Sequence, residues 1–266
     1  MFDPRVALAS LSGESDAAWA RGGLPFAGAA FLGGVALDEA ARAAARRMVA
    51  DRDRNEFLPP DPLAFVERQL RALDGAPLLV GVNVRSATPE PVRAAAAVCR
   101  DHGAVVEVNA HCRQPELCAA GCGESLLRDA DRLVSHVAAA AATGATVGVK
   151  VRAEVPGVDL GALAPRLADA GAAMVHVDAM DSPSAVGAVA EAAGDAVFVV
   201  ANNGVRDRAT AREYLALGAD AVSVGRPSTD PRVLARVRTA VDEWFGAGDG
   251  WTIDEPGAIR SPPDGS

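Results

Sequence analysis

The sequence contains few aromatic residues and almost no lysine. Only 4% of its 266 residues are Phe, Trp or Tyr, so any core must be built from Ala, Val and Leu. Half of the residues are apolar, which is enough to bury the core of one large domain or two small ones. The net charge of −9 argues against nucleic-acid binding driven by charge alone, because phosphate binding depends on Lys and Arg. A local basic patch stays compatible with this charge.

Lysine is the scarcest basic residue of the chain. Lys150 is the only lysine, and every other residue in the Lys-plus-Arg total of 26 is an arginine. A bias toward arginine says little about function, but the exception is informative. A compact amine that can lose its proton is a property that arginine cannot supply. Lys150 is therefore a candidate site residue.

Long apolar runs are also absent, and the first residues do not predict a signal peptide. Residues 1–5 contain no basic segment followed by an apolar one, which a signal peptide would need. The longest apolar stretch, residues 24–37, contains Pro25 and several glycines and is too short to span a bilayer. We therefore expect a cytoplasmic protein without membrane contact. In that reducing compartment the four cysteines are expected to be free thiols: Cys99, Cys112, Cys118 and Cys122.

One short phrase recurs along the chain: a glycine, usually Ala next, then a Val-rich run that ends in a polar residue. Each run is short and apolar, as a parallel strand buried on both faces is. The stretches between the runs have helical spacing, as in residues 89–101 and 208–217. The leading glycine is expected to end the preceding helix in the left-handed conformation. The phrases cover residues 75–83, 103–109, 144–150, 171–178, 194–202 and 218–225.

The N-terminal third adds two predicted strands, at residues 6–11 and 29–35, with helices near residues 15–21, 37–51 and 62–73. Eight alternating units in this length predict an α/β fold, a single-domain (β/α)₈ TIM barrel over residues 1–245. Residues 246–266, rich in Gly, Pro and Asp, are expected to form a loose tail. An open doubly wound sheet is the alternative, but residues 11–14 are not the glycine turn that such a sheet carries after its first strand.

Polar residues stand where the predicted strands end. In a TIM barrel the carboxyl ends of the strands form the active-site mouth, and residues two apart on a strand share a face. Glu107 therefore shares a face with Asn109, and His176 with Asp178. The last two strand ends contain glycine, which lets backbone N–H groups approach a phosphate closely. The candidates at the mouth are Ser10, Asn83, Arg85, Asn109, Lys150, Arg152, Asp178, Asn202, Asn203, Gly204, Gly225 and Arg226.

The segment Asn109-Ala-His-Cys112, followed by Gly121-Cys-Gly-Glu-Ser-Leu-Leu127, resembles the flavin-dependent dihydrouridine synthases. In that family an Asn at the end of strand 4 precedes a catalytic Cys by three residues, and a Gly-x-Gly-x-x-Leu-Leu helix start follows. The resemblance runs from about residue 6 to 245 and is strongest to a small archaeal branch. Further matches are Leu8-Ala-Ser-Leu-Ser-Gly13, Val149-Lys-Val-Arg152, Val200-Ala-Asn-Asn-Gly204 and Gly218-Ala-Asp-Ala-Val-Ser-Val-Gly-Arg226.

The resemblance implies that FMN lies across the mouth, with NADPH or NADH as its reductant. Lys150 would contact the N1/O2 edge of the flavin, and Asn109 would orient a pyrimidine ring. Hydride would go to C6 of that ring, and Cys112 would donate a proton to C5, since a thiol of ordinary pKa is mostly protonated at neutral pH. The implied cofactor-binding residues are Ser10, Asn83, Lys150, Arg152, Asp178, Asn203, Gly204, Gly225 and Arg226.

The chain departs from the family pattern in three places. His111-Cys112-Arg113 replaces Gly-Cys-Pro, and a neighbouring imidazolium and guanidinium would lower the thiol pKa and weaken it as an acid. Asp178 stands where the family has a His at the end of strand 6. Typical members also carry a C-terminal helical domain that holds tRNA, and only a short tail is expected here. Uridine in tRNA is the predicted substrate, and a free pyrimidine or other small ring, as in dihydroorotate and dihydropyrimidine dehydrogenases, is the alternative.

Three other hypotheses use the same residues differently. His111, Cys112, Cys118 and Cys122 could ligate a metal, but their spacing matches no common pattern, and no metal is predicted. The protein could be a non-catalytic barrel that binds flavin or a phosphate ligand. Lys150 could instead form a Schiff base, as in phosphate-binding aldolases. The sequence leaves the oligomeric state open.

Overall fold

The computed structural model describes residues 1–52 and 54–246 and confirms the predicted (β/α)₈ barrel. Its parallel strands pair in chain order, and β1 pairs with both β2 and β8, which closes the barrel. The predicted tail lies, from residue 247 on, outside the described residues. The strands are β1 (Val6–Leu8), β2 (Ala29–Ala36), β3 (Leu79–Arg85), β4 (Val105–Asn109), β5 (Thr146–Arg152), β6 (Ala172–Asp178), β7 (Phe198–Asn202) and β8 (Ala221–Val224).

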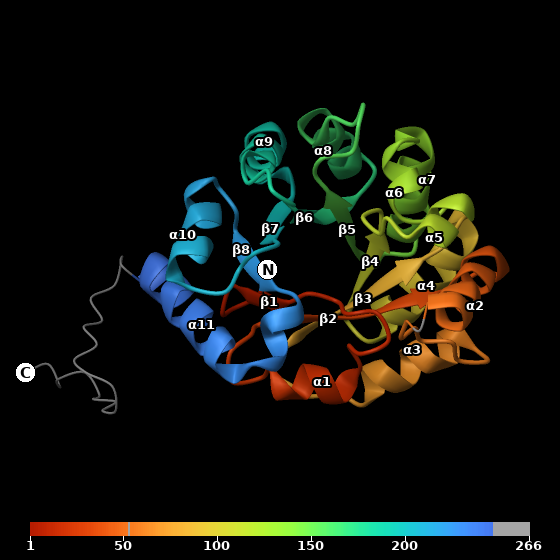
Figure 1. The fold of residues 1–266 in the computed structure, drawn as a ribbon, viewed down its shortest axis with the longest axis horizontal. Coiled ribbons are helices and arrows are strands. Elements are labelled where there is room, and N and C mark those ends of the chain that lie inside the picture. The colour runs from red at the N-terminus through yellow and green to blue at the C-terminus, as the bar shows by residue number, and fades with distance from the viewer. Residues whose placement is uncertain (53, 247–266) are drawn as a thin grey trace, which may run out of the picture.

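The helices surround the strands as an outer ring (Figure 1). Asp side chains accept hydrogen bonds from the first turn of α1, α3, α7, α8 and α10, which stabilises each helix start by about 1 kcal/mol. The helices are α1 (Ala17–Gly22), α2 (Glu39–Arg52), α3 (Pro62–Arg71), α4 (Pro89–Asp101), α5 (Pro115–Ala119), α6 (Glu124–Leu127), α7 (Ala130–Ala141), α8 (Leu160–Asp169), α9 (Ser184–Ala193), α10 (Arg208–Ala216) and α11 (Pro231–Gly246), with the 3₁₀ turns η1 (Gly194–Ala196) and η2 (Arg226–Thr229).

The glycine that opens each repeated phrase adopts the expected left-handed conformation. Gly171 and Gly218, for example, have φ of 99° and 94°. A Cβ at Gly171 would also lie 2.6 Å from the Cβ of Ala141, so the glycine permits close packing of its loop. The prediction differs at Gly194, which begins η1, so that β7 starts only at Phe198.

The first strand is shorter than predicted. It ends at Leu8 rather than at residue 11, because the chain turns at Leu11, whose carbonyl accepts hydrogen bonds from the N–H groups of Glu14 and Ser15. The Ser15 hydroxyl accepts a bond from the Leu11 N–H at 2.9 Å and donates one to the Gly33 carbonyl at 2.7 Å. Ser10 therefore lies in the loop that follows β1, half-buried, and not on the strand.

The barrel interior is apolar at the amino ends of the strands. Phe31 and Met174 are fully buried there, and Phe2 packs on Phe198 with ring centroids 5.2 Å apart. We call Phe2, Phe31, Met174 and Phe198 the floor. The main core between strands and helices is built from Ala, Val and Leu, as the composition predicts. Among the described residues, no helix combines the length and the apolar character that crossing a membrane requires.

Candidate functional site

Polar side chains fill the barrel interior above the floor. Strand register brings them together, since Asn83 is paired with Glu107, Asn109 with Lys150, and Lys150 with His176. Neighbouring strands lie roughly 4.8 Å apart, so these side chains form one group at the carboxyl half of the barrel. All are at most 2% exposed: Asn83, Glu107, Asn109, Lys150, His176 and Ser223.

Glu107 is the centre of a buried hydrogen-bond network. One carboxylate oxygen accepts a bond from Asn83 Nδ2 at 2.6 Å, and the other lies 2.7 Å from His176 Nδ1. Burial opposes the charge on Glu107, but His176, Lys150 and Asn83 outweigh it and lower the pKa of Glu107. Burial lowers the pKa of His176, so its ring is neutral at pH 7. Its Nδ1 contacts Glu107, and its Nε2 lies 2.7 Å from the Ser223 hydroxyl.

The same network holds the loop that carries Cys112. Asn109 Nδ2 donates to Asn83 Oδ1 at 2.8 Å, and Asn109 Oδ1 accepts the N–H groups of Cys112 at 3.1 Å and His111 at 3.3 Å. Both amide side chains thus have partners inside the protein. The contacts expected of Asn83 with a flavin and of Asn109 with a pyrimidine stay predictions.

Lys150 lies within β5 and is 1% exposed. Burial lowers the pKa of its ammonium group, while the negative charges of Glu107 and Asp178 act against that shift. Within residues 1–52 and 54–246 the structure gives the ammonium neither an ion pair nor a hydrogen bond. A buried cation without a partner is costly, so Lys150 is suited to an electron-rich ligand atom at the mouth.

His111 contacts Asp178, and this pair joins two of the departures from the family pattern. His111 Nδ1 lies 3.5 Å from Asp178 Oδ2, and both side chains are mostly buried. Burial lowers the pKa of His111 to about 4, so the imidazole is neutral at pH 7. Burial raises the pKa of Asp178, but the contact with His111 outweighs it and the pKa is lowered. The imidazolium expected beside Cys112 is therefore wrong.

Cys112 is 9% exposed and packs in a small apolar cluster with Met48, Leu117 and Cys122. All four cysteines are free thiols, as expected. Burial raises the pKa of Cys99 and of Cys122 to about 12, so both behave as core residues. The part of the chain that the structure describes gathers no group of three or more His, Cys, Asp or Glu side chains suited to a metal ion.

The turns after β7 and β8 have features that suit an anion, and we call Gly225, Arg226 and Ser228 the cradle. A Cβ built at Gly225 meets no atom within 4 Å, so there is open space beside this backbone. The Ser228 hydroxyl is buried and finds no hydrogen-bond partner among residues 1–52 and 54–246, and Arg226 is exposed. Asn203 and Gly204 have φ of 94° and 67°, and the Tyr214 hydroxyl holds the Asn203 carbonyl at 3.0 Å. An open space, an unused hydroxyl and a guanidinium suit a phosphate group.

Two buried arginines at the mouth are engaged with carboxylates. Arg152 Nη1 lies 3.2 Å from Glu124 Oε2, so its charge is already paired in this structure. Arg85 Nη1 lies 2.6 Å from Glu56 Oε2, with the side chains 3% and 1% exposed, and Arg85 also donates to the Ser12 hydroxyl. This pair ties the segment before α3 to the end of β3. Sequence reasoning missed Glu56, because it lies in an irregular segment without a repeating pattern.

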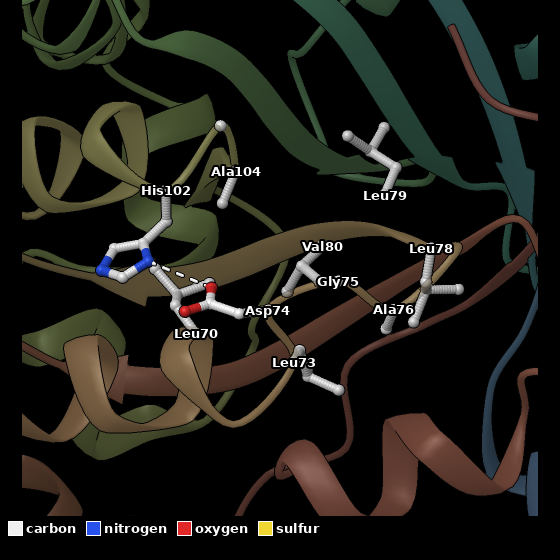
Figure 2. Close-up of a pocket in the computed structure, with 11 residues that line it drawn as sticks. Leu70, Leu73, Asp74, Gly75, Ala76, Leu78, Leu79, Val80, His102 and Ala104 are labelled. Carbon is white, nitrogen blue, oxygen red and sulfur yellow. Dashed lines mark ion pairs between the residues drawn. The ribbon is translucent and has the colours of Figure 1, made fainter.

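A small pocket lies at the other end of the barrel (Figure 2). It has a volume of about 140 Å³ and is lined by the loops that precede β3 and β4. His102 Nδ1 lies 3.5 Å from Asp74 Oδ1 there, and Asp74 is largely exposed. Because the pocket lies at the amino ends of the strands, it takes no part in the mouth.

The family model for dihydrouridine synthases matches residues 62–247, which is more than half of the chain. The chain belongs to the dihydrouridine synthase family. It is also 28% identical over 134 residues to an uncharacterized protein of Methanocaldococcus jannaschii, and the match covers 50% of this chain and 52% of that protein. The chain thus matches about half the length of this curated relative.

Solved structures show the same fold at low sequence identity. A DHODH from Eimeria tenella superposes with a TM-score of 0.56 at 15% identity, over 73% of this chain and 66% of that chain. A tryptophan synthase chain from Pyrococcus furiosus gives 0.55 at 16% identity, over 92% and 100%. The 3-hexulose-6-phosphate synthase from Salmonella typhimurium gives 0.54 at 16% identity, over 89% and 98%. Such similarity shows the barrel fold alone.

Proposed function

We propose that this protein is an FMN-dependent oxidoreductase that reduces the C5=C6 bond of uridine in tRNA. Membership of the dihydrouridine synthase family supports the reaction class. The observation that carries the proposal is Lys150, which is 1% exposed, lies at the mouth with Cys112 and has no hydrogen bond or ion pair to its ammonium from the described residues. An electron-rich ring placed over the mouth would supply the missing partner.

The residues at the mouth fit FMN at both of its ends. The cradle at Gly225, Arg226 and Ser228 offers open space, a guanidinium and an unused buried hydroxyl for the phosphate. Lys150 offers a cation for the ring, where it would favour an electron-rich edge. When bound and reduced by NADPH or NADH, the flavin supplies the hydride that goes to C6 of the uracil ring.

The protein's own residues would supply the proton and hold the reacting groups. Cys112 would donate its thiol proton to C5, and Asn109 fixes the loop that carries it through a 3.1 Å bond to the Cys112 N–H. His111 is neutral, so it adds no positive charge beside the thiol.

A free pyrimidine is the second candidate substrate. The net charge of −9 favours it, because a large polyanion such as tRNA is repelled unless a local basic surface compensates. The barrel of the DHODH from Eimeria tenella shares the fold. In this case the same residues would act on a small ring, and Arg113, exposed beside Cys112, would face an anionic substituent.

The test combines purified protein with FMN, NADPH and either tRNA or a free pyrimidine, in separate reactions. Unmodified tRNA transcripts are analysed for dihydrouridine by nucleoside mass spectrometry, and free uracil and orotate are followed by loss of ring absorbance. Dihydrouridine formation that disappears in Cys112→Ala supports the proposal. Turnover of the free ring alone supports the second candidate. FMN binding with no turnover of either substrate would contradict both and indicate a non-catalytic flavin barrel.

A further inference from the structure

Glu107 is a buried carboxylate that the proposed chemistry does not use. It is fully buried in the barrel between the floor and the mouth. A charge in that position is expensive unless every oxygen is satisfied and a counter-charge is near. Asn83 and His176 satisfy the two oxygens at 2.6 Å and 2.7 Å, and Lys150 is the positive charge nearby.

The carboxylate sets the direction of the hydrogen bonds that lead to the Cys112 loop. An ionised carboxylate only accepts, so Asn83 must direct its NH₂ toward Glu107 and its oxygen toward Asn109. Asn109 must then donate from its NH₂, which leaves its oxygen for the Cys112 N–H at 3.1 Å. One buried charge therefore orients two amides and, through them, the loop with the reactive thiol.

The same carboxylate shares the barrel interior with the only lysine of the chain, since Glu107 pairs with Gly148 and Lys150 stands two residues farther along β5 on the same face. The titratable groups near Lys150 are Glu107 on β4, Asp178 on β6, the Cys112 thiol in the loop after β4, and the rings of His111 and His176. Glu107 is the strongest of the groups that favour the protonated ammonium, ahead of Asp178. Both rings are neutral, so the carboxylates carry the counter-charge.

We propose that Glu107 is a positioning residue of the mouth, which holds Lys150 as a cation and orients Asn83, Asn109 and the Cys112 loop. The catalytic meaning of this role rests on the proposed function, but the role itself belongs to the protein without flavin. It follows that Lys150 keeps its charge although it is buried and no described residue forms an ion pair with it. The site would then present a cation at the same place in every turnover.

The single lysine allows a direct test. Protein labelled with ¹³C at lysine Cε gives one lysine signal, and its chemical shift reports the protonation of Lys150 as pH is raised. The measurement is made on flavin-free wild type, Glu107→Gln and Ser223→Ala. In Glu107→Gln the midpoint should fall by about one pH unit or more, the usual effect of removing a close opposite charge. In Ser223→Ala, which leaves the carboxylate in place, it should stay close to wild type.

A Glu107→Gln midpoint equal to that of wild type would overturn the proposal. Where Glu107→Gln alone does not fold, circular dichroism is used to test whether the double variant with Lys150→Met and Glu107→Gln folds. A folded double variant supports the proposal, because it shows that the single variant fails only through the buried ammonium left without its counter-charge. An unfolded double variant would contradict the proposal and give Glu107 a structural role only. The proposed function is tested separately by FMN binding and turnover, so failure of one leaves the other result intact.

Discussion

The two ends of the barrel interior are built from opposite chemistry. At the amino ends of the strands, Phe31 and Met174 are fully buried among apolar neighbours. At the carboxyl ends, Glu107, Lys150 and His176 are as deeply buried but are titratable. Apolar burial stabilises the fold by about 25 cal/mol per Å², whereas buried charges cost free energy unless they are well paired. The floor therefore contributes stability, and the mouth is retained for its chemistry.

The largest expected effect is a loss of stability when the floor is mutated. Met174→Ala removes a fully buried floor side chain and should lower the free energy of unfolding by about 2–5 kcal/mol, measured by urea denaturation. FMN affinity of the folded protein should not change. Val49→Ala, at an exposed position on α2, is the control and should stay within about 0.5 kcal/mol of wild type. A Met174→Ala variant as stable as wild type would contradict the claim that the floor contributes stability.

The second effect is acid lability of the mouth. Burial lowers the pKa of His111 to about 4, below the value of about 6.5 in an unfolded chain. Between these values the unfolded chain binds a proton that the folded protein does not, so stability is full above pH 6.5 and falls toward pH 4. For His111 the loss is up to about 3 kcal/mol.

Urea denaturation between pH 7 and pH 4.5 measures the slope of the unfolding free energy against pH. His111→Gln should lose less stability over that range than wild type, because one of the titrating rings is gone. Met174→Ala should keep the wild-type slope, since the floor contains no titratable side chain among its four residues. Equal slopes in wild type and His111→Gln would show that His111 is not a source of the acid lability.

A smaller effect concerns the cradle after β8. Arg226→Met should weaken FMN binding by about tenfold, since a charge-assisted hydrogen bond to phosphate contributes roughly 1.5–3 kcal/mol. Ser228→Ala should also weaken binding without lowering stability, because its hydroxyl has no protein partner. Titration of flavin fluorescence gives both affinities. Arg232→Met, at an exposed position at the start of α11, is the control. An equal loss of FMN affinity there would mean that overall charge, and not a contact of Arg226 with the phosphate, explains the effect.

The smallest effect is expected at the pocket of Figure 2. Asp74→Asn removes a largely exposed partner of His102 and should change the unfolding free energy by no more than about 0.5 kcal/mol. FMN affinity and turnover should equal those of wild type. A loss of either would mean that the amino end of the barrel also takes part in function.

The fold was predictable because its signals are local and repeated. Helix α4 has the predicted bounds, and Gly171 and Gly218 end helices as expected, since each depends on a few neighbouring residues. The end of β1 was not predictable, because it depends on a Ser15 hydroxyl that reaches Leu11 and Gly33. Such a bond exists only once the chain has folded.

The site was predictable in position and less so in contacts. Strand periodicity places Lys150 and Asp178 at the mouth, but it does not show that Asp178 meets His111 from another strand's loop. Ser223 stands out only as a polar residue in an apolar strand, and its bond to His176 links positions 47 residues apart. Long-range pairs of this kind are set by barrel closure and leave no local pattern.

The most direct measurement of the central claim is FMN binding by wild type and Lys150→Met, followed by absorbance and by flavin released on denaturation. The account predicts about one FMN per wild-type chain and an affinity at least about tenfold lower in Lys150→Met, because the unpaired ammonium is lost. Affinity is compared on folded protein, checked by circular dichroism, because Lys150→Met also removes a positive charge that favours the ionised form of Glu107. A wild-type protein that takes up no FMN, or a Lys150→Met variant that binds it equally well, would contradict the account.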